Sequence, residues 1–228
     1  MTERLELLNT ETHRALKMHP IGGQHPPFVP VTITELPAAA AVCPLFFNKD
    51  SQTGEFYVGA MFGFEAGELL VEDADKRDAL FRPLFLQRQG FLVAEDNIVI
   101  DLNDPRFAEG AGIALFEDDG QPSEALRRVQ WALGQLNAGV EATREFVREL
   151  LALKLVEPVD IALSFDDGRS LRLDGLYTVS RDALQDLDDG QVVDLFRKGY
   201  LQAAYTIALS LNQVAVLARR RNARLSAG

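Results

Sequence analysis

The sequence has few of the side chains that hold metals or act as nucleophiles. Its only cysteine, Cys43, excludes an intrachain disulfide and any cysteine-based zinc or iron–sulfur site. The stretch around it, Ala38 to Phe47, is apolar and offers no histidine or lysine that would stabilise a thiolate. A buried and inert thiol is therefore the favoured interpretation of Cys43.

Histidine is equally scarce and is confined to the N-terminal arm. His13, His19 and His25 are spaced by six residues, which suits neither one helix face nor a hairpin. We interpret them as surface or packing residues and expect no metal site. Because no histidine follows residue 25, a histidine general base is excluded from the rest of the chain unless this arm supplies it.

The common nucleotide-binding and hydrolase motifs are also missing. There is no Gly-Lys-Ser/Thr loop and no Gly-x-Ser-x-Gly elbow. Gly110-Ala111-Gly112 begins like a dinucleotide-binding loop, but Leu115 stands where the third glycine belongs. The acidic clusters lack the spacing of a calcium-binding loop and are interpreted as solvated turns and helix starts. We expect no cofactor and identify no catalytic residue, which favours a protein that is not an enzyme without deciding the question.

Positive charge is in short supply as well. Lys and Arg number 23 against 34 Asp and Glu, which gives a net charge of −11. Nucleic acid and anionic membrane surfaces are poor partners for such a chain, because both are bound through basic residues. The N-terminus has no apolar core of a secretory signal, so a cytoplasmic location is expected. One basic cluster is interpreted as complementing the dipole of a last helix: Arg219, Arg220, Arg221 and Arg224.

One uncharged run, Gly199 to Ala218, is long enough to span a membrane. It carries five polar side chains that would be costly in lipid: Gln202, Thr206, Ser210, Asn212 and Gln213. We therefore predict a buried core helix and no membrane span.

What the sequence does contain is enough for a sizeable core. A length of 228 residues and a hydrophobic content of 47% suit one large domain, residues 1–228. Residues 1–31, rich in proline and glycine, predict an irregular arm. A short helix is expected over 33–41, with Thr34 as its cap and Pro37 in its first turn.

Short apolar runs follow and predict strands. They lie at 45–47, 56–58, 61–64 and 69–71, and a hairpin is expected over 91–101. Residues 75–83 are expected to be helical.

From Ser123, the expected N-cap, the apolar period becomes that of a helix. One face collects Leu126, Val129, Leu133, Leu136, Val140, Val147, Leu150 and Leu151. A second apolar row lies opposite: Trp131, Ala138, Ala142, Phe146 and Leu153. Gly139 is expected to kink the helix or divide it. A helix with two apolar faces is either central to the fold or meets a partner on one of them.

The C-terminal region combines a hairpin with helices. Asp166-Asp167-Gly168 between two apolar runs predicts a tight turn. Ser180 is expected to cap a short helix, and the last helical region is expected from about 191 to 221, with Gly199 as a break. The predicted fold class is α+β, with an N-terminal antiparallel β-rich part packed against a C-terminal helical part containing one β-hairpin. A sub-division near residue 121 stays open.

The most suggestive constellation lies on the last helical region. Gln202, Thr206, Ser210 and Gln213 share one sector of a helix and form a neutral polar stripe. Three interpretations stay open: hydrogen bonds inside the core, one wall of a polar pocket, or an interface. The candidate binding residues are Gln202, Thr206, Ser210 and Gln213, together with Tyr205 and Glu35.

Many weak motifs, in a fixed order along the chain, suggest that it is related to a known family. They include the segments 25–31, 34–39, 44–47, 100–101, 174–179, 199–201 and 210–213. In this order and spacing the chain resembles the SapC-like family of bacterial proteins. The resemblance implies genomic neighbours such as TonB-dependent receptors and halogenase-like and cupin-like proteins, and a family name taken from a surface layer. It brings no catalytic residues, but Tyr205 and Glu35 resemble recurrent family positions or lie beside them, which is why they are candidates.

Three functions follow as hypotheses. The leading one is a non-enzymatic intracellular accessory or binding protein, associated with nutrient uptake or processing, whose partner is a protein or a small peptide-like ligand. The alternative is an enzyme with candidates Glu35, Arg82, Asp101, Tyr205 and Gln213. A surface-layer-associated protein is the third. A homo-oligomer is left open.

Overall fold

The computed structural model describes residues 4–19, 26–71, 81–107 and 112–227, and it divides the chain into two compact units. Unit 1 combines Met1–Gly23 with Arg82–Ala138, and unit 2 combines Gln24–Phe81 with Gly139–Gly228. Residue 121, where a sub-division was left open, lies inside unit 1.

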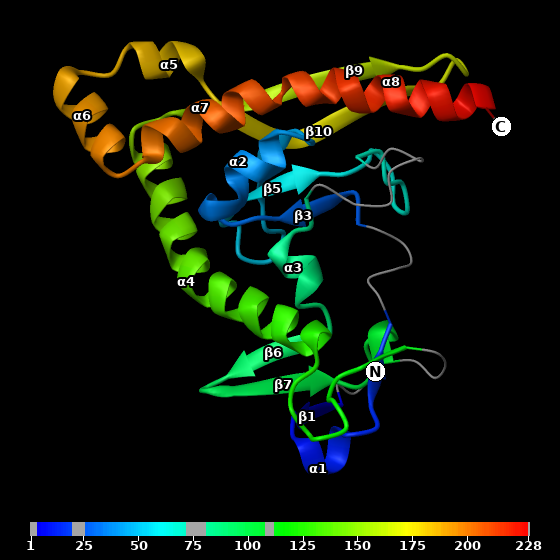
Figure 1. Ribbon diagram of the computed structural model, residues 1–228. Helices are drawn as coiled ribbons and strands as arrows, with labels where there is room; N and C mark the ends of the chain where they lie inside the picture. Colours follow the sequence, from blue (N-terminus) through cyan, green and yellow to red (C-terminus); the bar gives the residue numbers. More distant parts are fainter. Residues whose placement is uncertain (1–3, 20–25, 72–80, 108–111, 228) are drawn as a thin grey trace. The chain divides into compact units, whose positions relative to one another are not determined.

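Unit 1 is built around a small antiparallel sheet (Figure 1). Its elements are β1 (Leu5–Leu7), α1 (Thr10–His13), β2 (Lys17–Met18), α3 (Leu84–Gln87), β6 (Phe91–Ala94), β7 (Asn97–Asp101), η2 (Pro105–Phe107), β8 (Ile113–Ala114) and the first half of α4 (Glu124–Ala152). The sheet order is β1-β7-β6, and β2 pairs with β8. The predicted hairpin over 91–101 is confirmed, whereas the prediction of an irregular arm over 1–31 is wrong at β1, α1 and β2, and also at residues 28–30, which form a strand of unit 2.

The core of unit 1 lies between this sheet and α4. Phe91 and Ile100 are fully buried and pack with Leu126 and Val129 of α4. Each of these α4 residues belongs to the apolar face that the sequence pattern predicts. The prediction of the main core face therefore holds in this half of α4.

Unit 2 contains a five-stranded antiparallel sheet and most of the helices (Figure 1). Its elements are β3 (Phe28–Pro30), η1 (Ile33–Glu35), α2 (Leu36–Ala40), β4 (Leu45–Lys49), β5 (Phe56–Met61), the second half of α4, β9 (Val156–Ser164), β10 (Ser170–Val179), α5 (Arg181–Gln185), α6 (Asp189–Arg197), α7 (Tyr200–Ser210) and α8 (Asn212–Ala227). The strand order is β3-β5-β4-β10-β9. The chain is an α+β protein, as its sequence predicts, and the predicted C-terminal hairpin extends the N-terminal sheet.

The two sides of β4 show how helices cover this sheet. Phe46 and Phe47 are consecutive, so their side chains point to opposite faces, and both are fully buried. Phe46 packs in one cluster with Val214 and Leu217 of α8. The Phe47 ring lies 6.4 Å from the ring of Phe146 in α4. Helices therefore cover both faces of the unit 2 sheet.

Two local predictions need correction. The expected helix over 33–41 begins at Ile33, as the 3-10 turn η1 followed by α2, but Thr32 rather than Thr34 caps it, in a reciprocal capping box with Glu35. The run 69–71 is not a strand, although Leu70 is fully buried. Most of the predicted helix 75–83 lies outside the described residues.

Helix α4 runs without interruption from Glu124 to Ala152, so the expected division at Gly139 does not occur. Ser123 caps it, as predicted, by accepting a hydrogen bond from the amide of Leu126 at 3.3 Å. Gly139 instead makes room for Thr32, because a Cβ there would lie 3.1 Å from Thr32 side-chain atoms. The glycine serves packing within unit 2.

The long apolar stretch at the C-terminus forms α7 and α8, which join at Leu211. Gly199, with a φ of +74°, separates α7 from α6, as predicted. By length and composition Tyr200–Ser226 could cross a membrane, and a third of its apolar window is buried in the structure. Ala204, Ile207 and Leu217 of this stretch are fully buried, and Leu217 packs in one cluster with Phe46 and Leu176 of the sheet. The absence of a membrane span stays a prediction.

Candidate functional site

The predicted polar stripe divides between the core and the surface. Ser210 is buried, and its Oγ accepts a hydrogen bond from the Leu45 amide at 2.9 Å and donates one to the Ile207 carbonyl at 2.6 Å. Those two bonds use the hydroxyl to tie α7 to β4. At this position the structure shows hydrogen bonding inside the core.

The other members of the stripe point elsewhere. Gln202 is exposed, and Thr206 Oγ1 donates to the Gln202 carbonyl at 2.8 Å. Gln213 Nε2 donates to the carbonyl of Ala41 at 3.2 Å. Tyr205 is 41% exposed. Thr206 and Gln213 therefore bond to backbone carbonyls, and a binding role for these residues stays a prediction.

Glu35 has a clear structural function. Its Oε2 accepts hydrogen bonds from the Thr32 amide at 2.8 Å and from the Thr32 hydroxyl at 3.0 Å. The residue is buried, and these bonds satisfy its carboxylate where the chain enters η1. The remaining candidates of the enzymatic alternative, Arg82 and Asp101, belong to unit 1, whereas Glu35 belongs to unit 2.

The rare side chains of the sequence also have structural environments. Cys43 is buried, donates to the Ala39 carbonyl at 3.1 Å, and has its pKa raised to about 12 because burial disfavours the thiolate. The predicted inert thiol is confirmed. His13 Nε2 lies 3.2 Å from Glu6 Oε2, and His25 lies outside the described residues. Within the described ranges no three His, Cys, Asp or Glu side chains converge as metal ligands would.

A surface groove of about 450 Å³ lies in unit 2 beside the junction of α6 and α7. We call it the α4–α7 groove. It is lined by Glu145, Arg148, Glu149 and Ala152 of α4, together with Lys198 and Tyr200. The left-handed turn at Gly199 places Lys198 and Tyr200 on either side of the break between the helices.

Charges and one aromatic ring shape this groove. Lys198 Nζ lies 2.7 Å from Asp194 and 3.2 Å from Glu149, and these hydrogen bonds raise the lysine pKa. The Tyr200 ring stands edge-on against Phe146, with centroids 5.3 Å apart. Partial burial, and next the nearby charge of Glu145, raise the Tyr200 pKa. The phenol therefore stays neutral and can donate a hydrogen bond at neutral pH.

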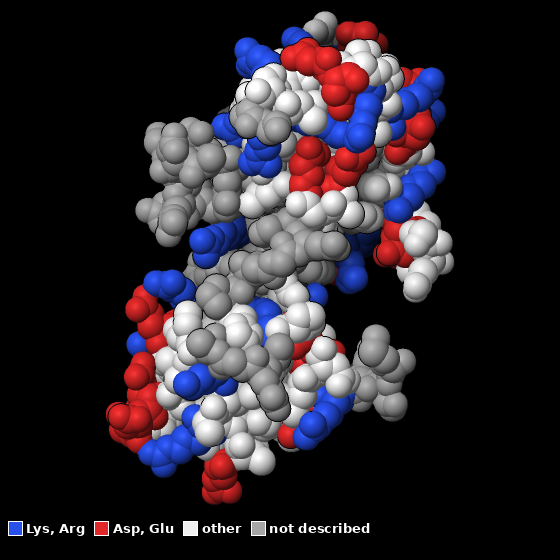
Figure 2. Space-filling model, turned by 90° about the vertical axis from the view of Figure 1, so that its right-hand side faces the viewer, with Lys and Arg blue, Asp and Glu red and all other residues white. Residues whose placement is uncertain are grey.

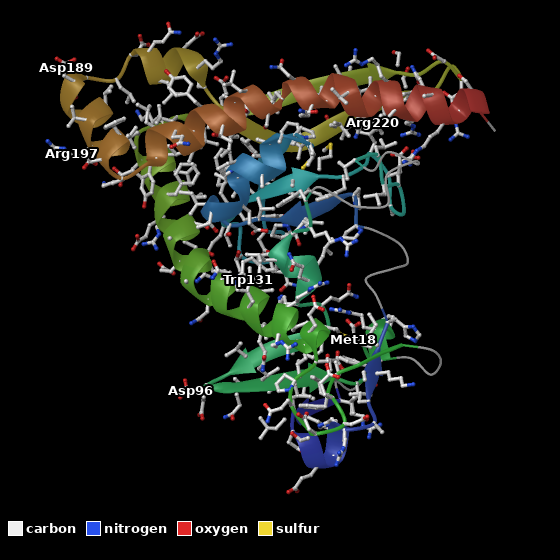
Figure 3. All side chains as sticks on the ribbon, in the orientation of Figure 1. Met18, Asp96, Trp131, Asp189, Arg197 and Arg220 are labelled. Carbon is white, nitrogen blue, oxygen red and sulfur yellow. The ribbon has the colours of Figure 1, made fainter. Side chains whose placement is uncertain are left out.

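Large apolar side chains are exposed on the helices next to the groove. Phe196 is 73% exposed, more than any other large hydrophobic residue in the described part of the chain. Val193 lies one turn earlier on α6 and is 45% exposed, while Leu209 of α7 is 57% exposed. We call Val193 and Phe196 the α6 patch. Figure 3 labels Asp189 and Arg197, which mark the two ends of α6.

Sequence reasoning did not single out the α6 patch. Val192, Val193, Leu195 and Phe196 look like the core side of a short helix, yet only Leu195 is fully buried. The start of α6 was readable, because Asp188 and Gln191 form a capping box. Which apolar residues face solvent was not readable, since it depends on how α6 packs on α7.

The comparisons with known proteins add one result. Neither the curated proteins nor the solved structures contain a match to this chain. The family model described as SapC matches residues 8–217 of the 228 residues. A match over this much of the sequence shows that the chain belongs to the SapC family.

Proposed function

We propose that this SapC-family protein is a non-enzymatic accessory protein that docks a protein partner, or a peptide-like segment of one, on the α6 patch and the adjoining α4–α7 groove. The observation that carries the proposal is the 73% exposure of Phe196 on a well-capped helix. An aromatic side chain held in water by a rigid helix is typical of a binding anchor.

The energetics of such an anchor are favourable. Full burial of a phenylalanine side chain is worth about 1.5–3 kcal/mol. Val193 adds a second apolar contact one helical turn away, at the same exposed surface. The charged and phenolic groups of the groove then supply directional contacts at the rim, as in ordinary protein interfaces.

The charge distribution supports a protein partner over nucleic acid. On the face drawn in Figure 2, basic side chains lie among acidic ones. In unit 2, Arg172 lies 3.2 Å from Asp160 and 2.8 Å from Asp174. Cations that already have carboxylate partners are poorly placed to neutralise phosphates.

The setting of this activity follows from the family resemblance. The partner belongs, on this proposal, to cytoplasmic components of nutrient uptake or processing, such as products encoded with TonB-dependent receptors or with halogenase-like and cupin-like proteins. The enzymatic and surface-layer alternatives draw less support. Glu35 and Ser210 both use their side chains to hold backbone groups in unit 2.

The test is site-specific photocrosslinking in the native cells. A benzophenone amino acid replaces Phe196, and in a control chain it replaces Gln52, an exposed residue of the β4–β5 turn in the same unit. We expect a discrete adduct with one protein from position 196 and none from position 52. Adding Val193→Ser should reduce that adduct roughly tenfold, because it removes the second apolar contact.

Two outcomes contradict the proposal. One is the absence of a discrete adduct at position 196. The other is the same set of adducts at both positions, which would indicate random collision. Either result would remove the α6 patch as a docking surface.

A further inference from the structure

The outer side of α7 and α8 is a second exposed surface of unit 2. Tyr205 is 41% exposed and Leu209 57%, while Asn212 and Arg219 are exposed and Val216 is half-buried. These five residues follow one another in steps of four, three, four and three along the helical run Tyr200–Ser226. That spacing is the one at which two helices pack along a common line. We call the five residues the α7–α8 seam.

The apolar part of the seam is not used by the core of unit 2. Core contacts come from the other side of the same helices, through Ile207, Val214 and Leu217, all of them buried. No charged residue lies between Gly199 and Ala218, and only a third of this apolar stretch is buried. An uncharged, apolar row of this length on the solvent side is typical of a contact surface.

Charge is distributed unevenly along the same part of the chain. Residues 181–198, which precede α7, contain five aspartates against three basic residues. Residues 199–228 contain four arginines and no acidic residue. Asp189 and Arg220, both labelled in Figure 3, belong to these two segments at opposite ends of α7. Two copies of such a surface have complementary charge only when they are antiparallel, because each acidic end then meets a basic end.

We propose that a second copy of this chain packs on the α7–α8 seam, with the two helical runs antiparallel and Asn212 on the two-fold axis. In this register Tyr205 of each copy meets Arg219 of the other, and Leu209 packs against Val216. The two Asn212 amides hydrogen-bond to each other and fix the register, as a single polar residue does in other helix seams. The surface is self-complementary, which a two-fold interface requires.

Arg219 is the residue that most favours a second copy. Within the described residues it has no carboxylate partner, unlike its neighbour Arg221, which pairs with Glu65. The antiparallel register places its guanidinium over the Tyr205 ring of the other copy, a cation–π contact that is formed twice. It also sets no two like charges opposite each other in the seam, whereas a parallel pair would place the two Arg219 side chains side by side.

The register is tested by cysteine crosslinking of the full chain, whose native Cys43 is buried. Asn212→Cys places two thiols across the axis, within the reach of a disulfide, so mild oxidation should give a covalent dimer. Ala223→Cys is the matched control. Ala223 is exposed 11 residues after Asn212, so its two copies lie about 33 Å apart in the antiparallel pair and should not link. Links at both positions, or at neither, would contradict the proposal.

A second measurement uses sedimentation across a dilution series of the full chain. We expect a dimer at high micromolar concentration that dissociates on dilution. Leu209→Glu puts a charge into the apolar part of the seam and should give a monomer at every concentration. Leu225→Glu is its control, because Leu225 is 42% exposed on the side of α8 away from the seam, and the dimer should persist.

Arg219→Gln should weaken the dimer about two- to fivefold, because it removes the cation–π contact. Protection of Cys43 from alkylation checks that each variant is folded, and the crosslink decides the question if Leu209→Glu is not. A wild-type chain that is monomeric at every concentration would overturn the proposal, whatever else binds the seam. A dimer that survives Leu209→Glu would overturn it as well.

Discussion

The two units each bury an arginine, and they satisfy it in different ways. In unit 1, Arg106 donates to the carbonyls of Gln87 at 2.9 Å and Gln89 at 3.0 Å. In unit 2, Arg221 pairs with the carboxylates of Glu65 at 3.0 Å and Glu68 at 3.7 Å. Both arginines are only 6% exposed.

The difference shows what each arginine does. Arg106 donates to neutral backbone carbonyls in the segment between α3 and β6. It therefore supplies hydrogen bonds to a loop whose carbonyls are not paired in a β-sheet. Burial lowers the pKa of its guanidinium, but the group stays charged at neutral pH. Arg221 also lies 4.4 Å from the centre of the Phe165 ring, and within the described residues its buried Nη1 has no hydrogen-bond partner.

Each unit also carries its own reporter, which makes the comparison measurable. Trp131 belongs to unit 1, and Cys43 belongs to unit 2. Unfolding of unit 1 can be followed by tryptophan emission. Opening of unit 2 can be followed by alkylation of Cys43 at pH 8, where the folded thiol stays protonated because its pKa is raised to about 12.

The largest effect is expected for Arg106→Met. The substitution takes the arginine donor away from two partly buried carbonyls, those of Gln87 and Gln89, and a lost buried partner costs about 1–3 kcal/mol. We expect a loss of about 3 kcal/mol of unfolding free energy, seen first as a lower urea midpoint for Trp131 emission. Arg106→Lys, which keeps the charge but not the planar fork, should fall between methionine and wild type. A methionine variant with an unchanged midpoint would contradict the role assigned to Arg106.

A smaller effect is expected for Arg221→Met. Glu65 is 55% exposed at its side chain, so water can solvate the carboxylate once its partner is gone. We expect the unfolding free energy to fall by about 2 kcal/mol, part of which comes from the lost contact with the Phe165 ring. Faster Cys43 alkylation would measure this fall. If Arg221→Met lowers the unfolding free energy more than Arg106→Met does, the proposed difference between the two buried arginines is wrong.

The smallest of the three effects is expected for Ser210→Ala. The change removes the acceptor of the Leu45 amide between α7 and β4. The unfolding free energy should fall by about 1 kcal/mol. Faster Cys43 alkylation in urea again measures this loss. Gln202→Ala, on the exposed part of the same polar stripe, is the control and should change stability by less than about 0.5 kcal/mol. Equal effects at both positions would show that the stripe does not divide as the structure indicates.

Local signals in the sequence predicted much of the fold correctly. The cap at Ser123, the hairpin turn at Asp166-Asp167-Gly168 and the break at Gly199 all depend on residues within one turn of each other. The misplaced cap at Thr34 shows the limit of this approach. Thr32 and Thr34 both have a hydroxyl suited to capping, and only Thr32 has Glu35 at the reciprocal position.

The candidate site was less accessible to sequence reasoning. The polar stripe at Gln202, Thr206 and Ser210 was visible as a pattern. Thr206 bonds locally to the Gln202 carbonyl, whereas the group that Ser210 accepts from, the amide of Leu45, is distant in sequence. Arg221 was interpreted as one of four cations complementing a helix dipole, yet it is buried against Phe165. In each case the deciding partner lies more than 50 residues away along the chain.

The sequence by itself determined the α+β class, the apolar face of α4, the inert environment of Cys43 and membership of the SapC family. These features depend on composition, on helical and strand periodicity, and on the order of short motifs. Only the tertiary structure decided that the C-terminal hairpin joins the N-terminal strands, and that Phe196 and Trp131 face solvent while Phe146 does not. The physical reason is that periodicity marks an apolar side chain, whereas its burial depends on which distant segment packs against it.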